Sequence, residues 1–163
     1  MKRFAPAAVA LALFAAGCDE KLNPVVPTSG QVTLVSSLSG AANVPPASSL
    51  EAGSTGSLSV TMTPAAAGAY TADFSFRLGG LVKAGVLPAP LNGGSVIVAG
   101  YVHQGTAGTV GAPVVQLPIS LQAPIVTPDG TAILTISGVA VSSSAAAAIL
   151  ANPSAFYFNL YSA

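Results

Sequence analysis

Hydrophobic residues occur at every second position over most of the chain from residue 31 onward. In residues 57–63, Leu58, Val60 and Met62 alternate with Ser and Thr, and residues 70–78 repeat the pattern with Tyr, Ala, Phe and Leu. A period of two is typical of antiparallel strands with one buried and one solvent-facing side. The pattern therefore predicts two strands, joined by a hairpin connection over residues 63–68 that carries Pro and Gly.

Comparable patterns predict five further strands, in residues 32–38, 96–102, 115–121, 132–136 and 156–161. The second of these runs is apolar on both faces, as in a central strand. The third contains Pro118, which cannot donate a backbone hydrogen bond, so we expect an edge strand or a bulged one. The last would place Tyr157 and Tyr161 on one face and Phe156 and Phe158 on the other. An uncharged edge there could pair with another chain; the alternative is that the fold covers both faces.

One segment departs from the period of two. Residues 142–144 are three serines, which are good N-caps, and residues 145–151 are Ala, Ile and Leu, which favour helix. The run ends at Asn152 and Pro153, where a helix would stop. Seven strands and one short crossover helix predict an all-β fold, an antiparallel Ig-like β-sandwich or barrel.

The N-terminus has the layout of a secretory signal, with Lys2 and Arg3 before an apolar run over residues 4–16. That run is shorter than the ~20 residues of a membrane-spanning helix. It ends in Ala-Ala-Gly-Cys at residues 15–18, which resembles the lipobox of bacterial lipoproteins, although Ala15 stands where that motif prefers Leu. The alternative is an ordinary signal peptide with a chance cysteine at position 18.

The lipobox resemblance implies that Cys18, the one cysteine of the chain, is lipidated and becomes the new N-terminus. This predicts a signal peptide over residues 1–17, a lipid-proximal tether over 18–30 and a folded domain over 31–163. Acyl chains such as palmitate would attach the protein to the inner or outer membrane of a bacterial cell envelope, with the domain in the periplasm or outside the cell. Acylation would also explain an unpaired cysteine in a secreted protein.

Charge is scarce: five Lys or Arg and five Asp or Glu make up 6% of 163 residues, and the net charge is zero. Ordinary domains have about 25%. Because contacts to phosphates need clustered basic residues, we expect no nucleic-acid partner. Enzymes gather titratable groups in a cleft, so the scarcity also favours a non-enzymatic role.

Two segments carry a family resemblance. Residues 38–46 have the sequence LSGAANVPP, and residues 101–115 have the sequence YVHQGTAGTVGAPVV. They are similar to the LSGxxEVPP opening and the central HIHxGxxGxxGPVV segment of the CHRD domain, a module named after chordin and widespread in secreted bacterial proteins. Residues 149–161 correspond to that family's short helix and its YVNVHT motif. The resemblance spans about residues 31–161 and implies a β-sandwich with an interaction or structural role.

The chain departs from the CHRD pattern at its charged and histidine positions. Tyr101 occupies the position of the first histidine of HIH, and Tyr161 lies where the later histidine motif would be. His103 is the only histidine of the chain. Asn43 replaces the glutamate before VPP, and the family's C-terminal GEIRGQ strand has no counterpart. The glutamate and the GEIRGQ strand would be lost together if the acidic and basic motifs form a pair in the usual fold, because a partly buried charge without its partner is costly. This hypothesis places Asn43 near the C-terminal strand.

His103 and Tyr101 are the candidate ligand-binding residues. Zinc and copper sites need three or four His or Cys ligands, and this chain offers His103 and a cysteine expected to be acylated, so we expect no metal and no cofactor. No spacing of nucleophile, base and acid predicts catalytic residues. We expect His103 to be structural, bonded at the start of the Gly-rich turn.

These observations predict a lipid-anchored cell-envelope module with a non-enzymatic interaction or structural role, whose protein or envelope partner is unknown. The alternative is a periplasmic protein that binds a small ligand or metal through the Gly-rich loop around His103. A hydrolase is a third option, although no nucleophile motif suggests it.

Overall fold

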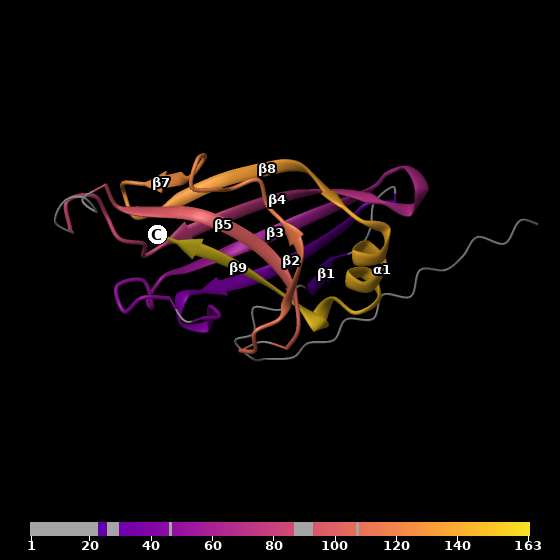
Figure 1. Ribbon diagram of the computed structural model, residues 1–163, viewed down its shortest axis with the longest axis horizontal. Coiled ribbons are helices and arrows are strands. Elements are labelled where there is room, and N and C mark those ends of the chain that lie inside the picture. Colours follow the sequence, from indigo (N-terminus) through magenta and orange to yellow (C-terminus); the bar gives the residue numbers. More distant parts are fainter. Residues whose placement is uncertain (1–22, 26–29, 46, 87–92, 107) are drawn as a thin grey trace, which may run out of the picture.

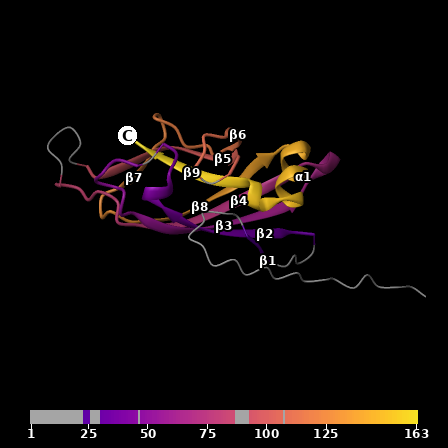
Figure 2. The same cartoon turned by 90° about the horizontal axis from the view of Figure 1, so that it is seen from below.

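Two antiparallel β-sheets pack face to face in the computed structural model, which describes residues 23–25, 30–45, 47–86, 93–106 and 108–163 (Figures 1 and 2). The predicted signal peptide, Cys18 and most of the predicted tether lie outside the described residues. The all-β sandwich predicted from the sequence is confirmed. No helix in the described part of the chain is long and apolar enough to cross a membrane.

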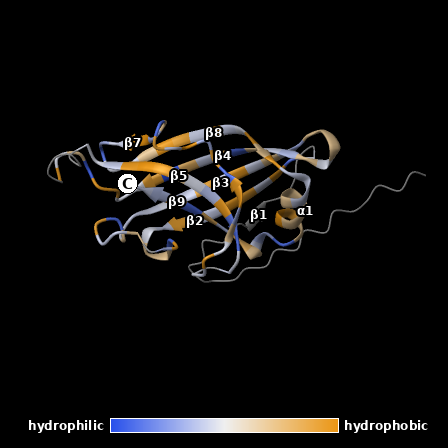
Figure 3. Cartoon of the chain, viewed as in Figure 1, coloured by the Kyte–Doolittle hydropathy of each residue, from blue (hydrophilic) through white to orange (hydrophobic). Residues whose placement is uncertain are grey.

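The first sheet has five strands in the order β1-β2-β3-β4-β8. Their bounds are β1 (Asn23–Val25), β2 (Val32–Ser39), β3 (Thr55–Pro64), β4 (Tyr70–Gly79) and β8 (Ala132–Val141). Hydrophobic and hydrophilic residues alternate along β3 and β4 (Figure 3). Apolar side chains such as Leu58 and Phe74 face the core, while Ser and Thr residues cover the outer face.

The second sheet is built around β5 (Ser95–Gln104). Strands β6 (Ala112–Gln116) and β7 (Ile125–Thr127) pair with successive parts of one of its edges, and β9 (Phe156–Ser162) pairs with the other edge. The central position predicted for residues 96–102 is therefore confirmed. The Phe158 ring stacks on the Phe74 ring of the first sheet, with centroids 6.0 Å apart, which joins the two sheets in the core.

Helix α1 (Ser143–Ala151) connects β8 to β9 and lies at one end of the sandwich (Figure 1). Ser142 is its N-cap, as predicted: the hydroxyl accepts a hydrogen bond from the Ala145 N–H at 3.2 Å. Ala145, Ala146 and Ile149 are buried in the core. Three short 3₁₀ turns complete the structure, at Gly40–Ala42, Ala66–Gly68 and Pro153–Ala155.

The strand predicted over residues 115–121 is wrong in its extent. Strand β6 ends at Gln116, and the Ile119 N–H donates to the Leu117 carbonyl at 2.8 Å, so the chain turns at Pro118. The proline has no N–H and a fixed φ, so it takes the chain out of the ladder. Leu117 and Ile119 nevertheless remain buried in the core, which explains the alternating pattern.

Two short strands were not predicted. Strand β1 lies inside the segment expected to be a tether and pairs with β2, with Pro24 opposite Leu34. Strand β7 pairs with the start of β5. Each has three residues, which is too short for a period of two to stand out in the sequence.

Candidate functional site

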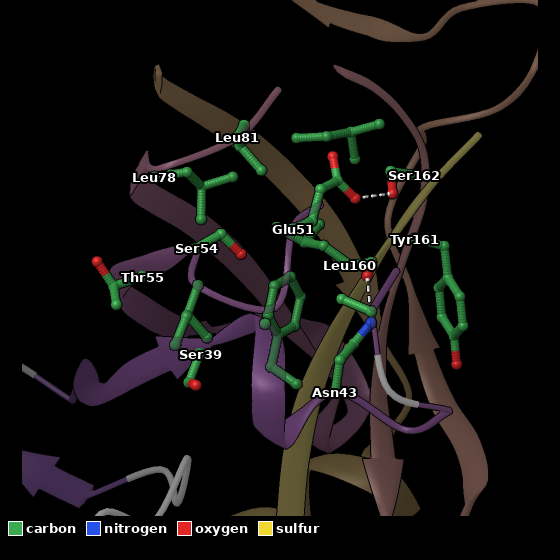
Figure 4. A pocket seen from close by; sticks show the side chains of 15 residues that line it. Ser39, Asn43, Glu51, Ser54, Thr55, Leu78, Leu81, Leu160, Tyr161 and Ser162 are labelled. Carbon is green, nitrogen blue, oxygen red and sulfur yellow. Dashed lines mark hydrogen bonds between the residues drawn. The ribbon is translucent and has the colours of Figure 1, made fainter. Parts of the chain in front are cut away.

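The end of the sandwich opposite α1 contains a cavity of about 70 Å³. It is partly open to solvent and is lined by the end of β2, the starts of β3 and β5, the ends of β4 and β9, and the loops beside them (Figure 4). Most of the surface that lines it is apolar, and Leu38, Leu78, Leu81 and Leu160 contribute to it. Glu51 brings a carboxylate into this apolar lining.

Glu51 lies in the loop between the first 3₁₀ turn and β3, and it is 6% exposed. The Ser95 hydroxyl donates a hydrogen bond to Oε1, and the Ser162 hydroxyl donates one to Oε2. Ser95 is itself held in place, because its hydroxyl accepts from the Val82 N–H at 2.9 Å. The carboxylate therefore links its loop to β5 and β9, which pair with each other in the second sheet.

Gly40 sets the position of the Glu51 loop. A Cβ at Gly40 would lie 2.1 Å from the Glu51 carbonyl oxygen, a distance that no side chain can occupy. The backbone closes the loop further: the Gly40 N–H donates to the Ser54 carbonyl at 2.9 Å, and the Ser54 N–H donates to the Glu51 carbonyl at 2.8 Å. Only glycine allows the two segments to approach this closely.

The segment that follows β2 covers part of the outer edge of β9. The Asn43 Nδ2 donates to the Leu160 carbonyl at 3.1 Å (Figure 4), and the Val44 carbonyl accepts from the Asn159 Nδ2 at 2.6 Å. Asn43 thus lies beside the C-terminal strand, where the hypothesis of an acid–base pair in the CHRD family requires it. The pair itself stays a prediction.

His103 and Tyr101 lie together on the outer face of the second sheet. The His103 ring stacks on Tyr157, with centroids 5.0 Å apart and planes at 7°, and the Tyr101 ring meets it edge-on at 5.7 Å. Tyr161 completes the aromatic cluster, with its ring 5.8 Å from that of Tyr101. The predicted division of β9 is confirmed: its Tyr residues lie on this face, and Phe156 and Phe158 belong to the core.

His103 is hydrogen-bonded to the Gly-rich turn and is 7% exposed. Its Nδ1 is 2.9 Å from the Gly111 carbonyl, which can only accept, so Nδ1 carries the proton. In the neutral ring Nε2 is then an acceptor, and the Tyr161 hydroxyl lies 3.5 Å from it. The Gly111 N–H donates to the Tyr157 hydroxyl at 2.8 Å. A ligand role for His103 or Tyr101 stays a prediction.

Asn159 is a buried polar residue of β9 that contacts both the segment after β2 and the aromatic cluster. Its side chain is 1% exposed, and Nδ2 donates to the Val44 carbonyl and, at 3.3 Å, to the Tyr161 hydroxyl. Its Oδ1 has no hydrogen-bond partner among the described residues. A buried amide oxygen without a donor is destabilising and therefore rare.

Asp73 and Asp129, the other acidic residues in the described part of the chain, lie apart from these sites. Asp73 Oδ1 accepts from the Gly138 N–H at 2.8 Å on β8, and Asp129 is exposed. Among the described residues, no three His, Cys, Asp or Glu side chains are grouped so that they could hold a metal ion. Cys18 lies outside the described residues, so its lipidation stays a prediction.

Neither a protein-family model nor a curated protein nor a solved structure matches this chain. The membership of the CHRD family therefore stays a prediction. The structure defines the class: an all-β sandwich of two antiparallel sheets, with a helix at one end and a carboxylate-containing cavity at the other.

Proposed function

We propose that the chain is a lipid-anchored module of the bacterial cell envelope with a non-enzymatic binding role. The observation that carries the binding role is the end cavity, which combines an apolar lining with one buried carboxylate. Such a combination suits recognition of a ligand by shape and charge. Glu51 borders this cavity while His103 packs on the outer face of β5, so the two groups do not share a site that would suit acid–base chemistry.

The anchor follows from the lipobox resemblance at residues 15–18. Strand β1 begins five residues after Cys18. Even a fully extended segment of that length spans only about 18 Å. An acylated Cys18 would therefore hold the sandwich close to the membrane surface, where a binding module would meet envelope components.

Labelling of cells with a fatty-acid analogue tests the anchor. The wild-type chain should take up the label, and Cys18→Ala should lose it because the acyl acceptor is gone. Ala15→Leu is a matched control, since it brings the lipobox closer to the preferred sequence and should keep the label. Equal labelling of the wild type and Cys18→Ala would remove the anchor from the proposal.

A second candidate function, binding of a metal or small ligand beside His103, is supported by two acceptors. These are the Nε2 atom that faces the Tyr161 hydroxyl and the Asn159 Oδ1 that lacks a donor among the described residues. The melting temperature on addition of Zn²⁺ or Cu²⁺ tests it. A rise that His103→Asn abolishes would support this function, because Asn keeps a donor for the Gly111 carbonyl but lacks the second nitrogen. A flat titration of the wild type would exclude these metals.

A further inference from the structure

The Glu51 carboxylate is buried without a positively charged neighbour in the described part of the chain. Its partners there are the neutral hydroxyls of Ser95 and Ser162. The two basic side chains among the described residues, Arg77 and Lys83, are exposed. Burial of an ion costs several kcal/mol unless an opposite charge compensates it. The fold therefore buries an acidic side chain for which it supplies no counter-ion among these residues.

Each oxygen of this carboxylate has acceptor capacity left. A carboxylate oxygen can accept about two hydrogen bonds. Oε1 accepts one from Ser95 and Oε2 accepts one from Ser162. The remaining acceptor sites suit a ligand that brings several N–H donors to one point.

Two hollows meet at Glu51. One is the cavity of about 70 Å³, and the other is a groove of about 440 Å³ whose lining includes Pro45, Leu50 and Val82. Five residues line both: Asn43, Ala47, Glu51, Tyr161 and Ser162. Both hollows are partly open to solvent, so a ligand can reach Glu51 from outside, and the leucines of the smaller hollow can contact an apolar part of that ligand. Figure 4 shows Glu51 between Leu81 and Leu160, with its carboxylate directed at Ser162.

This lining favours an organic cation over a metal ion. Ca²⁺ takes six to eight oxygen ligands, several of them usually carboxylates. Among the described residues, Glu51 is the one carboxylate in this lining, and the leucines Leu78, Leu81 and Leu160 occupy much of the remaining wall. A primary ammonium instead offers three N–H donors on an apolar chain. The cavity has about half the ~150 Å³ that accommodates benzene, so it suits a short alkyl chain.

We propose that this end of the sandwich binds a small primary alkylammonium, with its charged group on Glu51 and its alkyl chain in the leucine-lined cavity. The inference rests on the proposed binding function and names its ligand class. The proposed anchor is tested separately, by labelling of Cys18. A negative result with the ligand would therefore leave the anchor standing, and a negative labelling result would leave the ligand site standing.

The experiment measures the melting temperature of the full chain in a non-ionic detergent. The probe is n-butylammonium chloride, and the matched controls are sodium chloride at the same ionic strength and butan-1-ol, which has the same chain without the charge. We expect a saturable rise with butylammonium, because a ligand that binds the folded state stabilises it. Neither control should produce that rise.

Two variants locate the site. Glu51→Gln keeps the side-chain size and removes the charge, so the affinity for butylammonium should fall at least about tenfold. Asp129→Asn removes a charge from an exposed turn and should respond as the wild type does. Leu81→Phe, which fills the cavity and keeps Glu51, should abolish the response to butylammonium and retain one to methylammonium. It serves as the second test if Glu51→Gln does not fold.

Several results would overturn the inference. An equal rise with butan-1-ol would show that the cavity selects only for the alkyl chain, and an unchanged affinity in Glu51→Gln would place the ligand elsewhere. A rise with Ca²⁺ or Na⁺ in place of butylammonium would identify a metal site. No rise with any probe would show that Glu51 is accommodated without a ligand.

Discussion

The two ends of the sandwich are closed by different means. At one end α1 places Ala146 and Ile149 between the sheets, and a void of about 10 Å³ beside Ile149 is lined by apolar side chains alone. At the other end, loops surround a cavity of about 70 Å³ that contains a buried carboxylate. Dense apolar packing stabilises a fold, while a buried charge beside empty space opposes stability. We interpret the difference as a division of roles, in which one end maintains the fold and the other is the proposed ligand site.

The largest effect that this comparison predicts is at the helix end. Ile149→Ala should lower the free energy of unfolding by about 2–5 kcal/mol, because Ile149 is 3% exposed and its loss leaves a cavity in the core. Leu81→Ala, beside the existing cavity, should cost less than about 1.5 kcal/mol. Urea denaturation of both variants measures the two changes. Equal losses would contradict the division between the ends.

A smaller loss is expected in the loop that holds Glu51. Gly40→Ala should cost about 1–3 kcal/mol, since its Cβ would meet the Glu51 carbonyl oxygen and the loop would have to move. A Cβ at Gly53 would have no heavy atom within 4 Å, so Gly53→Ala should stay within about 0.5 kcal/mol of the wild type. Both changes are read from denaturation curves. A Gly40→Ala variant as stable as Gly53→Ala would show that the loop is not fixed as described.

The smallest of these effects concerns the start of α1. Ser142→Ala should destabilise the fold by about 1 kcal/mol, because the Ala145 N–H loses its hydroxyl acceptor. Ser143→Ala, one residue further along the exposed first turn, should have little effect. Thermal unfolding followed by circular dichroism separates the two. A silent Ser142→Ala would mean that packing alone holds the helix in place.

Much of the fold could be predicted because its signals are local. The alternation in β3 and β4, the serine cap of α1 and the two faces of β9 each depend on residues close in sequence, and the structure confirms them. The prediction over residues 115–121 failed because side chains keep alternating past Pro118 after the ladder has ended. Strands β1 and β7 were missed because three residues carry no measurable period.

The Glu51 site could not be predicted from the sequence. It joins Glu51, Ser95 and Ser162, which are far apart in the chain. Glutamate and serine are also common in exposed loops and at strand ends, so neither residue type marks a site in the sequence. The sequence singled out His103 and Tyr101 instead, because the histidine is unique and lies in a recognisable motif. The scarcity of charge was a hint that each acidic residue deserves inspection. In a chain with five acidic residues, burial of one of them is seldom incidental.

Calorimetric titration of n-butylammonium into the full chain tests the ligand site at the open end most directly. We expect saturable binding to the wild type, and binding at least about tenfold weaker to Glu51→Gln, while Asp129→Asn binds as the wild type does. Equal binding to the wild type and Glu51→Gln, or heat that never saturates, would contradict the claim that the open end is a ligand site organised around Glu51.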